Sequence, residues 1–380
     1  MRSKEYYVTL TGGKINIGDF LITYRCEKLL NHLRPDRDLI KINSWENLEE
    51  NLELINNSKG IIIYGGPGYQ PQMYPKIYKI VDDLEKIKVP IIPLGLGWYG
   101  YPGDEITLEN YKFSKKTFNF LKDHVEKKGI NLSCRDYYTR KMLKNNGLKN
   151  VKMTGCPVWY DLESLGKEVE SLKNIKKVVY TPAQDKTFKD QSIEVMKILR
   201  KKFPKAEIYC SFHRGLGIKN HYTKDWEVEN TKKIASAAKN LNIIPIDTAF
   251  DLEKIKFYDE CDLHVGYRVH GHIYFLSKRK PSILLHEDGR GKGVSEALNI
   301  LGIDAFKRNI LSKTIEKSND FLFRVMKKFN FIILPDDKAL KILDRYLDEE
   351  IENGFIRFKG VGKIIDENYE EMSNFIKKLP

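Results

Sequence analysis

Two short segments in the last third of the chain place charged side chains directly after apolar, strand-like runs. Arg268 and His270 follow the run DLHVGY, and Glu287 and Asp288 stand where the next run, PSILLHE, ends. In an open α/β sheet, ligands bind outside the carboxyl ends of the strands. Arginine holds phosphate or carboxylate groups well, and histidine titrates near neutral pH, where it can transfer protons. These residues therefore predict a site for an anionic ligand that undergoes proton transfer.

The segment HEDGRGKG adds two cations, Arg290 and Lys292, among three glycines. An Asp-Gly turn with solvated charges would explain this segment without any ligand. Four charged side chains after a single apolar strand nevertheless favour a flexible loop that closes over a substrate. On this interpretation Arg290 and Lys292 bind the substrate, and Glu287 or Asp288 transfers a proton.

The neighbouring histidines predict neither a metal site nor a second catalytic group. His270 and His272 are two residues apart, so on a helix they point to different sides, unlike the ligands of an HExxH motif. We expect His264 and His272 to be structural. The five cysteines are widely spaced and form no CxxC pair, which favours free, buried thiols in a reducing cytoplasm.

Two glycine-rich loops in the first third of the chain follow apolar runs. TGGKINIGDF contains Gly12, Gly13, Lys14 and Asp19, and IIIYGGPG contains Gly65 and Gly66. Glycines let a backbone approach a ligand, and the amides at a helix N-terminus favour anions. The spacing is not GxGxxG, so a nicotinamide cofactor is disfavoured. The alternative is two tight turns, with Asp19 complementing a helix dipole.

A third arginine, Arg135, begins a predicted helix in the segment SCRDYYTRKML. Asp136 is explained by helix capping. Arg135 is not, because a cation at a helix N-terminus opposes the helix dipole unless an anion lies beside it. Arg135 is therefore a candidate ligand for a phosphate or carboxylate.

Alternating strand-like and helical periods supply the elements that must position these residues. Strands are predicted at 6–11, 38–42, 60–66, 89–97, 130–136 and 151–155, and, after a break, at 176–183, 206–212, 242–247, 262–267 and 281–287. Helices are predicted between them, in the first half at 18–33, 44–57, 74–87, 114–128 and 137–146. Such alternation is typical of parallel, doubly wound sheets.

The predicted fold is α/β, with two Rossmann-like domains in a GT-B-like arrangement. The first domain spans residues 1–160 and the second 176–310. A helical extension over 311–380 contains a helix at 339–351, capped by Asp336 and Asp337, and is expected to pack back on the first domain.

Composition limits the partners. A net charge of +13 on 380 residues favours an anionic partner, whether a phosphorylated small molecule, a nucleic acid or an acidic membrane surface. The N-terminal residues lack the features of a signal peptide, and no window approaches the roughly 20 apolar residues of a membrane span. We expect a soluble cytoplasmic protein, which the charge could hold peripherally against anionic lipid.

The loop ending in Gly18-Asp19, the segment Ser133-x-Arg135-Asp136, TGCPV at 154–158, and Arg268-x-His270 followed by PSILLHEDGRG resemble the polysaccharide pyruvyl transferase family. The resemblance covers residues 7 to 305 and leaves the C-terminal part outside. It implies a GT-B-like fold and transfer of a pyruvyl group from phosphoenolpyruvate to saccharide hydroxyls, with release of phosphate and formation of a pyruvate ketal.

The resemblance also implies roles for individual residues. Arg135, Arg268 and His270 would hold the phosphate and carboxylate of phosphoenolpyruvate. His270, or a carboxylic acid from Glu287 or Asp288, would protonate the methylene carbon, and Asp19 would deprotonate the attacking hydroxyl. No metal or cofactor is needed beyond the donor. The implied acceptor is a lipid-linked saccharide of surface polysaccharide biosynthesis, at the cytoplasmic face of the membrane.

Two other functions fit parts of the sequence. A glycosyltransferase on the same scaffold would use the cations to bind the diphosphate of a nucleotide sugar. A basic nucleic-acid-binding protein ranks third, because its cations would spread along a surface instead of gathering at strand ends. The polar segment from Ser211 to Asp225, with His213, Arg214 and His221, is either an acceptor-binding segment or an ordinary insertion.

Overall fold

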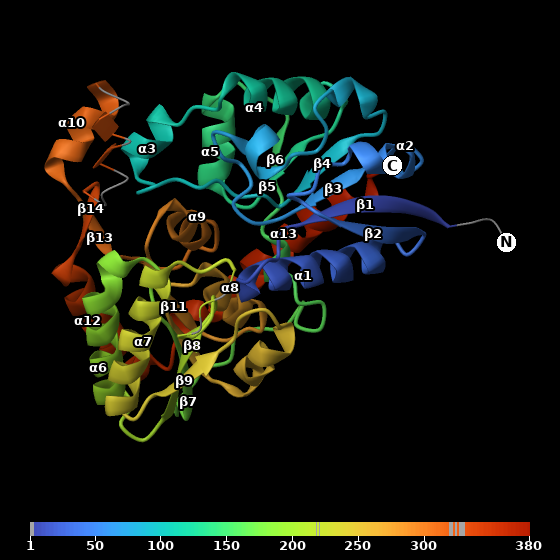
Figure 1. Ribbon diagram of the computed structural model, residues 1–380. Coiled ribbons are helices and arrows are strands. Elements are labelled where there is room, and N and C mark those ends of the chain that lie inside the picture. The colour runs from blue at the N-terminus through green and yellow to red at the C-terminus, as the bar shows by residue number, and fades with distance from the viewer. Residues whose placement is uncertain (1–3, 218, 220, 319–321, 324, 327–330) are drawn as a thin grey trace. The chain divides into compact units, whose positions relative to one another are not determined.

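The computed structural model describes residues 4–380 except 218, 220, 319–321, 324 and 327–330, and it divides into two compact units (Figure 1). The first unit contains residues 1–13, 19–165 and 364–380. The second contains residues 14–18 and 166–363. Residues 14–18, which comprise a short loop and the first two residues of the first long helix, thus belong with the second unit.

The first unit is built on a parallel sheet in the order β2-β1-β3-β4. Its strands are β1 (Glu5–Thr11), β2 (Arg37–Asn43), β3 (Ile61–Tyr64) and β4 (Ile91–Leu94). The six predicted strands do not form one sheet, because β5 (Leu132–Cys134) and β6 (Val151–Met153) pair separately. A single bridge from Leu96 to Cys134 links the two sheets, just past the left-handed turn at Gly95 (φ +64°).

The helices of this unit match the sequence periods only in part. They are α1 (Ile17–Leu33), α2 (Leu52–Asn56), α3 (Glu105–Asn110), α4 (Lys115–Asn119) continuing through η4 (Phe120–Glu126), and α5 (Tyr137–Asn145). The helix predicted at 44–57 shortens to the turn η1 (Glu49–Asn51) and α2. The helix predicted at 74–87 is wrong: only the short turns η2 (Met73–Ile77) and η3 (Leu84–Lys86) form there. Tyr74 precedes a proline and is extended at φ −118°, ψ 136°.

The second unit contains a six-stranded parallel sheet in the order β12-β11-β10-β7-β8-β9. The strands are β7 (Lys177–Thr181), β8 (Glu207–Phe212), β9 (Ile244–Asp247), β10 (Leu263–Gly266), β11 (Ser282–His286) and the unpredicted β12 (Ile303–Asp304). Its helices are α6 (Lys189–Lys202), α7 (Asp225–Asn240), α8 (Val269–Ser277) and α9 (Gly289–Ala297), with the turns η6 (Lys186–Phe188) and η7 (Leu252–Glu260). Strands β10 and β11 are buried along their whole length, and each is followed directly by polar residues.

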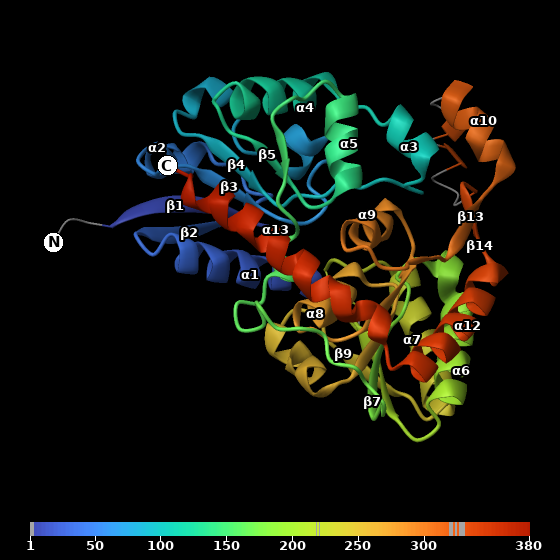
Figure 2. The ribbon, with the colours of Figure 1, turned by 180° about the vertical axis from the view of Figure 1, so that it is seen from behind.

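The segment predicted as a helical extension at 311–380 is not uniformly helical, and parts of it lie outside the described residues. It contains α10 (Ile310–Ser318), α12 (Asp337–Asn353), η8 (Ile356–Phe358) and α13 (Lys359–Lys377), but also β14 (Ile333–Pro335), which pairs antiparallel with β13 (Phe306–Arg308). Asp336 caps α12, as predicted. Most of α13, red in Figure 2, belongs to the first unit, where Glu371 forms an ion pair with Lys152 at 2.7 Å.

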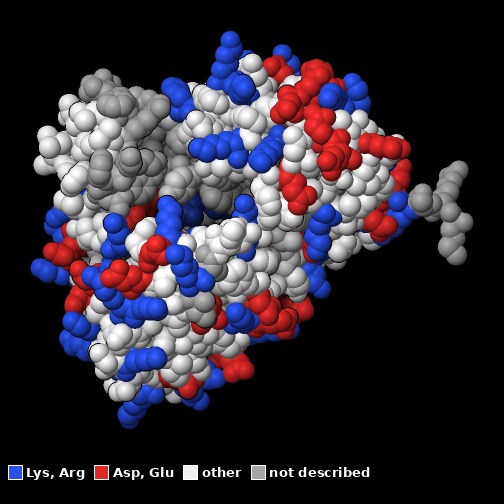
Figure 3. Space-filling view, viewed as in Figure 1, with Lys and Arg blue, Asp and Glu red and all other residues white. Residues whose placement is uncertain are grey.

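The predicted fold class, α/β with two Rossmann-like units on parallel sheets and a helical C-terminal tail, is confirmed in these elements. None of the described helices is both long enough and apolar enough to span a bilayer. On the face seen in Figure 3, Lys and Arg side chains are interspersed with Asp and Glu side chains. The positive charge therefore forms no single continuous patch on that face.

Candidate functional site at the strand ends of the second unit

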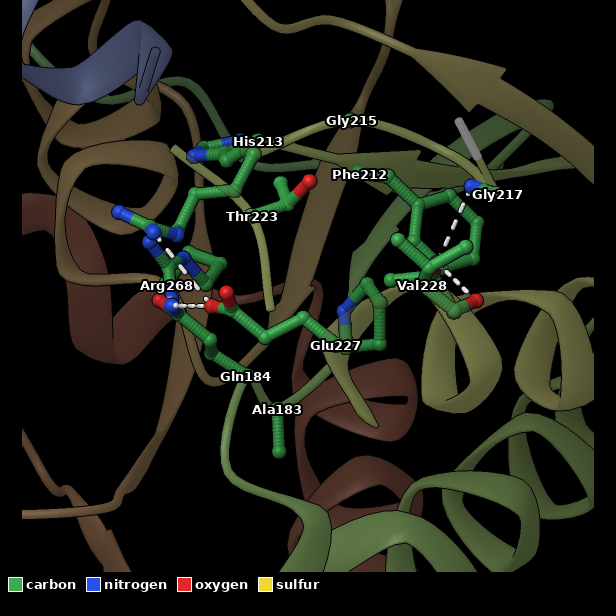
Figure 4. Close-up of a pocket in the computed structure, with 13 residues that line it drawn as sticks. Ala183, Gln184, Phe212, His213, Gly215, Gly217, Thr223, Glu227, Val228 and Arg268 are labelled. Carbon is green, nitrogen blue, oxygen red and sulfur yellow. Dashed lines mark hydrogen bonds and ion pairs between the residues drawn. The ribbon is translucent and has the colours of Figure 1, made fainter. Parts of the chain in front are cut away.

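A pocket opens at the carboxyl ends of β7, β8 and β10 in the second unit (Figure 4). Loops after all three strands contribute to it, as expected for a ligand site in a parallel sheet. Its walls are formed by Pro182, Ala183, Gln184, Phe212, His213, Arg214, Gly215, Gly217, Thr223, Glu227, Val228, Thr231 and Arg268. Arg268 is the one predicted site residue among them, whereas His213 and Arg214 come from the segment whose role was left open.

Arg268 is fixed in place at the end of β10 and the start of α8. Its backbone N–H donates to the Thr181 hydroxyl at 3.2 Å. Its guanidinium donates to the side-chain oxygen of Gln184 at 2.8 Å and to that of Asn16 at 3.2 Å. Both acceptors are neutral amides, and the side chain is partly exposed at the pocket. A partly exposed guanidinium beside a helix N-terminus is well placed to bind an anion.

Glu287 lies at the end of β11, and its carboxylate faces the same loops. It accepts hydrogen bonds from the backbone N–H groups of Gln184 at 3.1 Å and Asp185 at 3.5 Å. Burial raises the pKa of Glu287 from its ordinary value of 4.5 to about 7, although the charge of Arg268 lowers it. A carboxyl group with a pKa near the working pH can deliver a proton and recover it.

Asp288, the neighbouring carboxylate, has a structural role. It caps α9 by accepting a hydrogen bond from the Arg290 backbone N–H at 2.9 Å. Its carboxylate also accepts hydrogen bonds from the Arg290 guanidinium at 2.6 to 3.0 Å. The flexible closing loop predicted for this segment is wrong, because α9 begins at Gly289 and takes in Arg290 and Lys292. Lys292 forms an ion pair with Asp304 at 2.9 Å. Because Asp288 caps α9, the segment that follows it is helical and does not form a loop.

His270 sits in the first turn of α8, and the loop at 14–18 packs against it. A Cβ added to Gly18 would lie 2.0 Å from the His270 Nδ1 atom, so only glycine fits without a shift. The loop is further held by the bond from the Ile17 N–H to the His213 carbonyl at 3.0 Å. Gly18 therefore has a steric role against His270, which the sequence alone does not disclose.

The other histidines of the unit are buried. His264 is bonded to Thr181 at 2.8 Å and to Ser282 at 2.7 Å, and His272 shares the same Ser282 hydroxyl. Burial lowers the pKa of His264 to about 3, so it stays neutral. Both have the buried, bonded environment of structural histidines, as predicted. His213, at the pocket, is bonded to Tyr258 at 2.9 Å, and burial together with Arg268 lowers its pKa strongly.

Arg135 belongs to the first unit, where it is almost completely buried. Its side chain is 1% exposed and forms an ion pair with Asp136 at 3.2 Å. A Cβ added to Gly97 would lie 2.5 Å from the guanidinium carbon, so the group lies directly against that backbone. Its Nη2 atom is buried and has no hydrogen-bond partner among the described residues. Asp136 caps α5 by accepting from the Thr139 N–H at 2.7 Å, as predicted.

The remaining predicted residues of the first unit lie in its glycine loops. Asp19 is in the first turn of α1, and its charge raises the pKa of Tyr78, which burial already raises. Gly12 is exposed, with open space around its α-carbon, whereas Gly65 packs against Ile22 of α1. Gly66 has a φ of +76°, which requires a left-handed conformation.

Lys14, from the glycine loop, falls in the second unit. It is exposed and lies 5.8 Å over the Tyr222 ring. Within the part of the chain that the structure describes, no three His, Cys, Asp or Glu side chains are grouped to hold a metal ion.

Three residues that sequence reasoning missed connect Arg268 to its surroundings: Gln184, Asn16 and Glu227. Gln184 accepts from Arg268 and donates to the Glu227 carboxylate at 2.9 Å. A signal was present for Gln184, because it follows the predicted strand KKVVYTPA as the other site residues follow theirs. None was present for Glu227, whose helix α7 approaches the site only through tertiary packing.

Comparison with known proteins gives one match by family. A family model described as "Polysaccharide pyruvyl transferase" matches residues 16–288, more than half of the chain. No curated protein sequence matches.

Several solved structures are similar in overall course. S. aureus MnaA with UDP has a TM-score of 0.48 at 12% identity, covering 99% of both chains. The wall teichoic acid polymerase TagF has a TM-score of 0.43 at 14% identity, covering 99% of this chain and 89% of that one. UDP-GlcNAc 2-epimerase from Neisseria meningitidis, bound to UDP-GlcNAc, has a TM-score of 0.44 at 12% identity, covering 90% of this chain and all of that one.

Proposed function

Because the chain belongs to the polysaccharide pyruvyl transferase family, we propose that it moves the pyruvyl group of phosphoenolpyruvate onto two hydroxyls of a saccharide, forming a pyruvate ketal and releasing phosphate. One observation provides the main support for the proposal. A fixed arginine, Arg268, and a carboxyl group of pKa about 7, Glu287, meet the same loop at the strand ends of the second unit. The pair offers an anion ligand beside a proton donor.

Arg268 and His270 are the proposed ligands of the donor. Phosphoenolpyruvate is a compact polyanion with a carboxylate and a phosphate, and a guanidinium can hold either group through two parallel hydrogen bonds. Both residues stand at the N-terminus of α8, where the backbone dipole favours negative charge. Arg214, which lines the pocket, is an additional cation that the donor phosphate can approach.

Glu287 is the proposed general acid. Its proton passes to the methylene carbon of the donor, which becomes a methyl group and leaves positive charge on the adjacent carbon. A saccharide hydroxyl adds to that carbon and returns a proton to the Glu287 carboxylate. Phosphate then leaves with the electrons of its C–O bond, and a second hydroxyl adds to close the ketal and gives its proton to the departing phosphate. Arg268 offsets the charge on the departing phosphate.

Asp288 is a weaker candidate for the acid, because its carboxylate is already bound to Arg290 and to the cap of α9. The predicted roles of Asp19 as base and of Arg135 as donor ligand stay predictions, as do those of Arg290, Lys292 and the glycine loops. We propose a lipid-linked saccharide as acceptor, handled at the cytoplasmic face of the membrane during surface polysaccharide assembly. Phosphoenolpyruvate is the only co-substrate in this scheme.

Calorimetric titration tests the donor directly. Phosphoenolpyruvate, UDP-GlcNAc and CDP-glycerol are titrated into the wild type and into the variant Arg268→Met. The proposal expects phosphoenolpyruvate to bind the wild type and to bind Arg268→Met at least about tenfold more weakly, a loss of about 1.4 kcal/mol. Arg345→Met is the matched control, because Arg345 is exposed on α12 and faces Glu349 at 3.8 Å.

Two results would overturn the proposal. Binding of a nucleotide sugar without binding of phosphoenolpyruvate would favour the glycosyltransferase interpretation. Strong, salt-dependent binding of generic DNA or RNA with neither small molecule bound would favour a nucleic-acid-binding protein.

A further inference from the structure

We propose that Gln184 is a spacer that binds Arg268 through its side chain and Glu287 through its backbone, and so prevents a direct ion pair between them. Gln184 would then be a positioning residue, acting through two groups of the site. The inference deepens the proposed function and rests on it for its catalytic meaning. The geometry itself does not depend on the identity of the substrate.

The two contacts of Gln184 use different parts of the residue. Its backbone N–H donates to the Glu287 carboxylate at 3.1 Å. Its side-chain oxygen accepts from the Arg268 guanidinium at 2.8 Å. In the part of the chain that the structure describes, no cation forms an ion pair with Glu287. The arginine and the carboxylate therefore share one neighbour without binding each other.

Glu227 fixes which end of the Gln184 amide faces Arg268. The amide nitrogen donates to Glu227 at 2.9 Å, and this leaves the amide oxygen as the end that faces the guanidinium (Figure 4). Glu227 is itself held by the Lys224 backbone N–H at 2.9 Å and by Arg214 at 3.4 Å. A carboxylate anchored in this way prevents the amide from turning over.

On its other side Arg268 meets a second neutral amide. Asn16, in the loop at 14–18, accepts from the guanidinium at 3.2 Å. Amide oxygens orient a guanidinium through hydrogen bonds but do not neutralise its charge. Gln184 and Asn16 together thus hold the guanidinium of Arg268 in a fixed position.

The spacer also affects Glu287. The charged groups that influence this carboxyl are Arg268, Asp288, Arg290 and Asp185, and burial is the larger effect. A carboxylate in direct contact with an arginine has its pKa lowered by roughly one to three units. Direct pairing would therefore ionise Glu287 at neutral pH. Keeping the two groups apart preserves Glu287 as an acid.

The test measures the protonation of Glu287 without substrate. In protein labelled with ¹³C at the Glu side-chain carboxyls, the Glu287 signal is assigned by its loss in Glu287→Gln, and its pKa is read by NMR titration. In Gln184→Ala the spacer is gone, and we expect the pKa of Glu287 to fall by about one unit or more as Arg268 closes on it. In Glu227→Gln we expect a smaller fall, because the amide of Gln184 is held less firmly.

Glu229→Gln is the matched control. Glu229 is on the same helix as Glu227, but it is exposed and pairs with Lys233 at 2.5 Å, so this variant should leave the pKa of Glu287 unchanged. An unchanged or raised pKa in Gln184→Ala would overturn the inference. If Gln184→Ala does not fold, Glu227→Gln decides: no fall there overturns the inference too.

The outcomes separate this inference from the proposed function. A fall in the pKa together with no binding of phosphoenolpyruvate to the wild type would support the spacer and reject the donor. Binding of phosphoenolpyruvate together with an unmoved pKa would reject the spacer and support the donor.

Discussion

Two arginines of this chain, Arg135 and Arg268, occupy equivalent places in the sequence and opposite environments in the structure. Each lies in the short connection between a buried strand and a helix, β5 and α5 in one unit, β10 and α8 in the other. Arg135 is almost fully buried and pairs directly with Asp136. Arg268 is partly exposed, is held by neutral amides, and has Glu287 nearby without an ion pair.

The difference shows that the role of an arginine depends on the groups that contact its guanidinium. A buried arginine paired with a carboxylate stabilises the loops around it and has its charge compensated internally. Arg268 is instead oriented by two neutral amides at the wall of a pocket. The Nη2 atom of Arg135 does not fit this contrast, because it is buried and has no hydrogen-bond partner among the residues that the structure describes.

Arg135→Met should cost the most stability. The substitution leaves Asp136 buried without its cation, which costs about 3–5 kcal/mol of the free energy of unfolding. Urea unfolding measures the loss, with Arg345→Met as an exposed control. If Arg135→Met unfolds like the wild type but no longer binds phosphoenolpyruvate, Arg135 serves the ligand and the contrast with Arg268 fails.

Arg268→Met should have the opposite profile, with nearly unchanged stability and a large loss of activity. Removing a positioned charge that stabilises a departing anion lowers catalytic efficiency roughly 100-fold to 1000-fold, by comparison with similar groups. Phosphate release at limiting phosphoenolpyruvate provides kcat/KM, and urea unfolding provides stability. A variant that loses stability but keeps its kcat/KM would show that Arg268 is structural.

Glu287→Gln should change how stability depends on pH. Because burial raises the pKa of Glu287 from 4.5 to about 7, the folded state prefers the protonated form. The stabilising contribution is complete below pH 4.5 and is lost as the pH rises through 7. Wild-type stability should thus fall between these pH values by up to about 3 kcal/mol more than that of the variant. Equal slopes in urea unfolding across this range would contradict the raised pKa.

Gly18→Ala should have the smallest effect of the four. The new Cβ would lie 2.0 Å from the His270 Nδ1 atom, so the histidine or the loop must move. Overpacking of this kind costs about 1–3 kcal/mol, partly offset by the better helix propensity of alanine. Gly12→Ala is the matched control for thermal unfolding, because its Cβ would meet nothing within 4 Å. Equal losses in the two variants would show that Gly18 is not packed on His270.

The sequence predicted strands better than it predicted their surroundings. All eleven predicted strands exist, since short apolar runs bounded by turn residues are a reliable signal for buried strands. The helix at 74–87 failed because Pro75 constrains Tyr74 to an extended conformation against the apolar period. The closing loop at HEDGRGKG failed because the glycines suggested mobility, whereas the Asp288 cap starts a helix there.

The order of elements, the family, and the positions of Arg268, His270 and Glu287 at strand ends can be predicted from the amino-acid sequence, because these depend on local periods and short motifs. The protonation and the ionic contacts of these groups depend on tertiary packing. Burial and the Gln184 bridge between Arg268 and Glu287 arise from segments distant in the chain, whereas Asp136 is the direct sequence neighbour of Arg135. Since charge and protonation depend on those neighbours, two arginines alike in sequence differ in their chemistry.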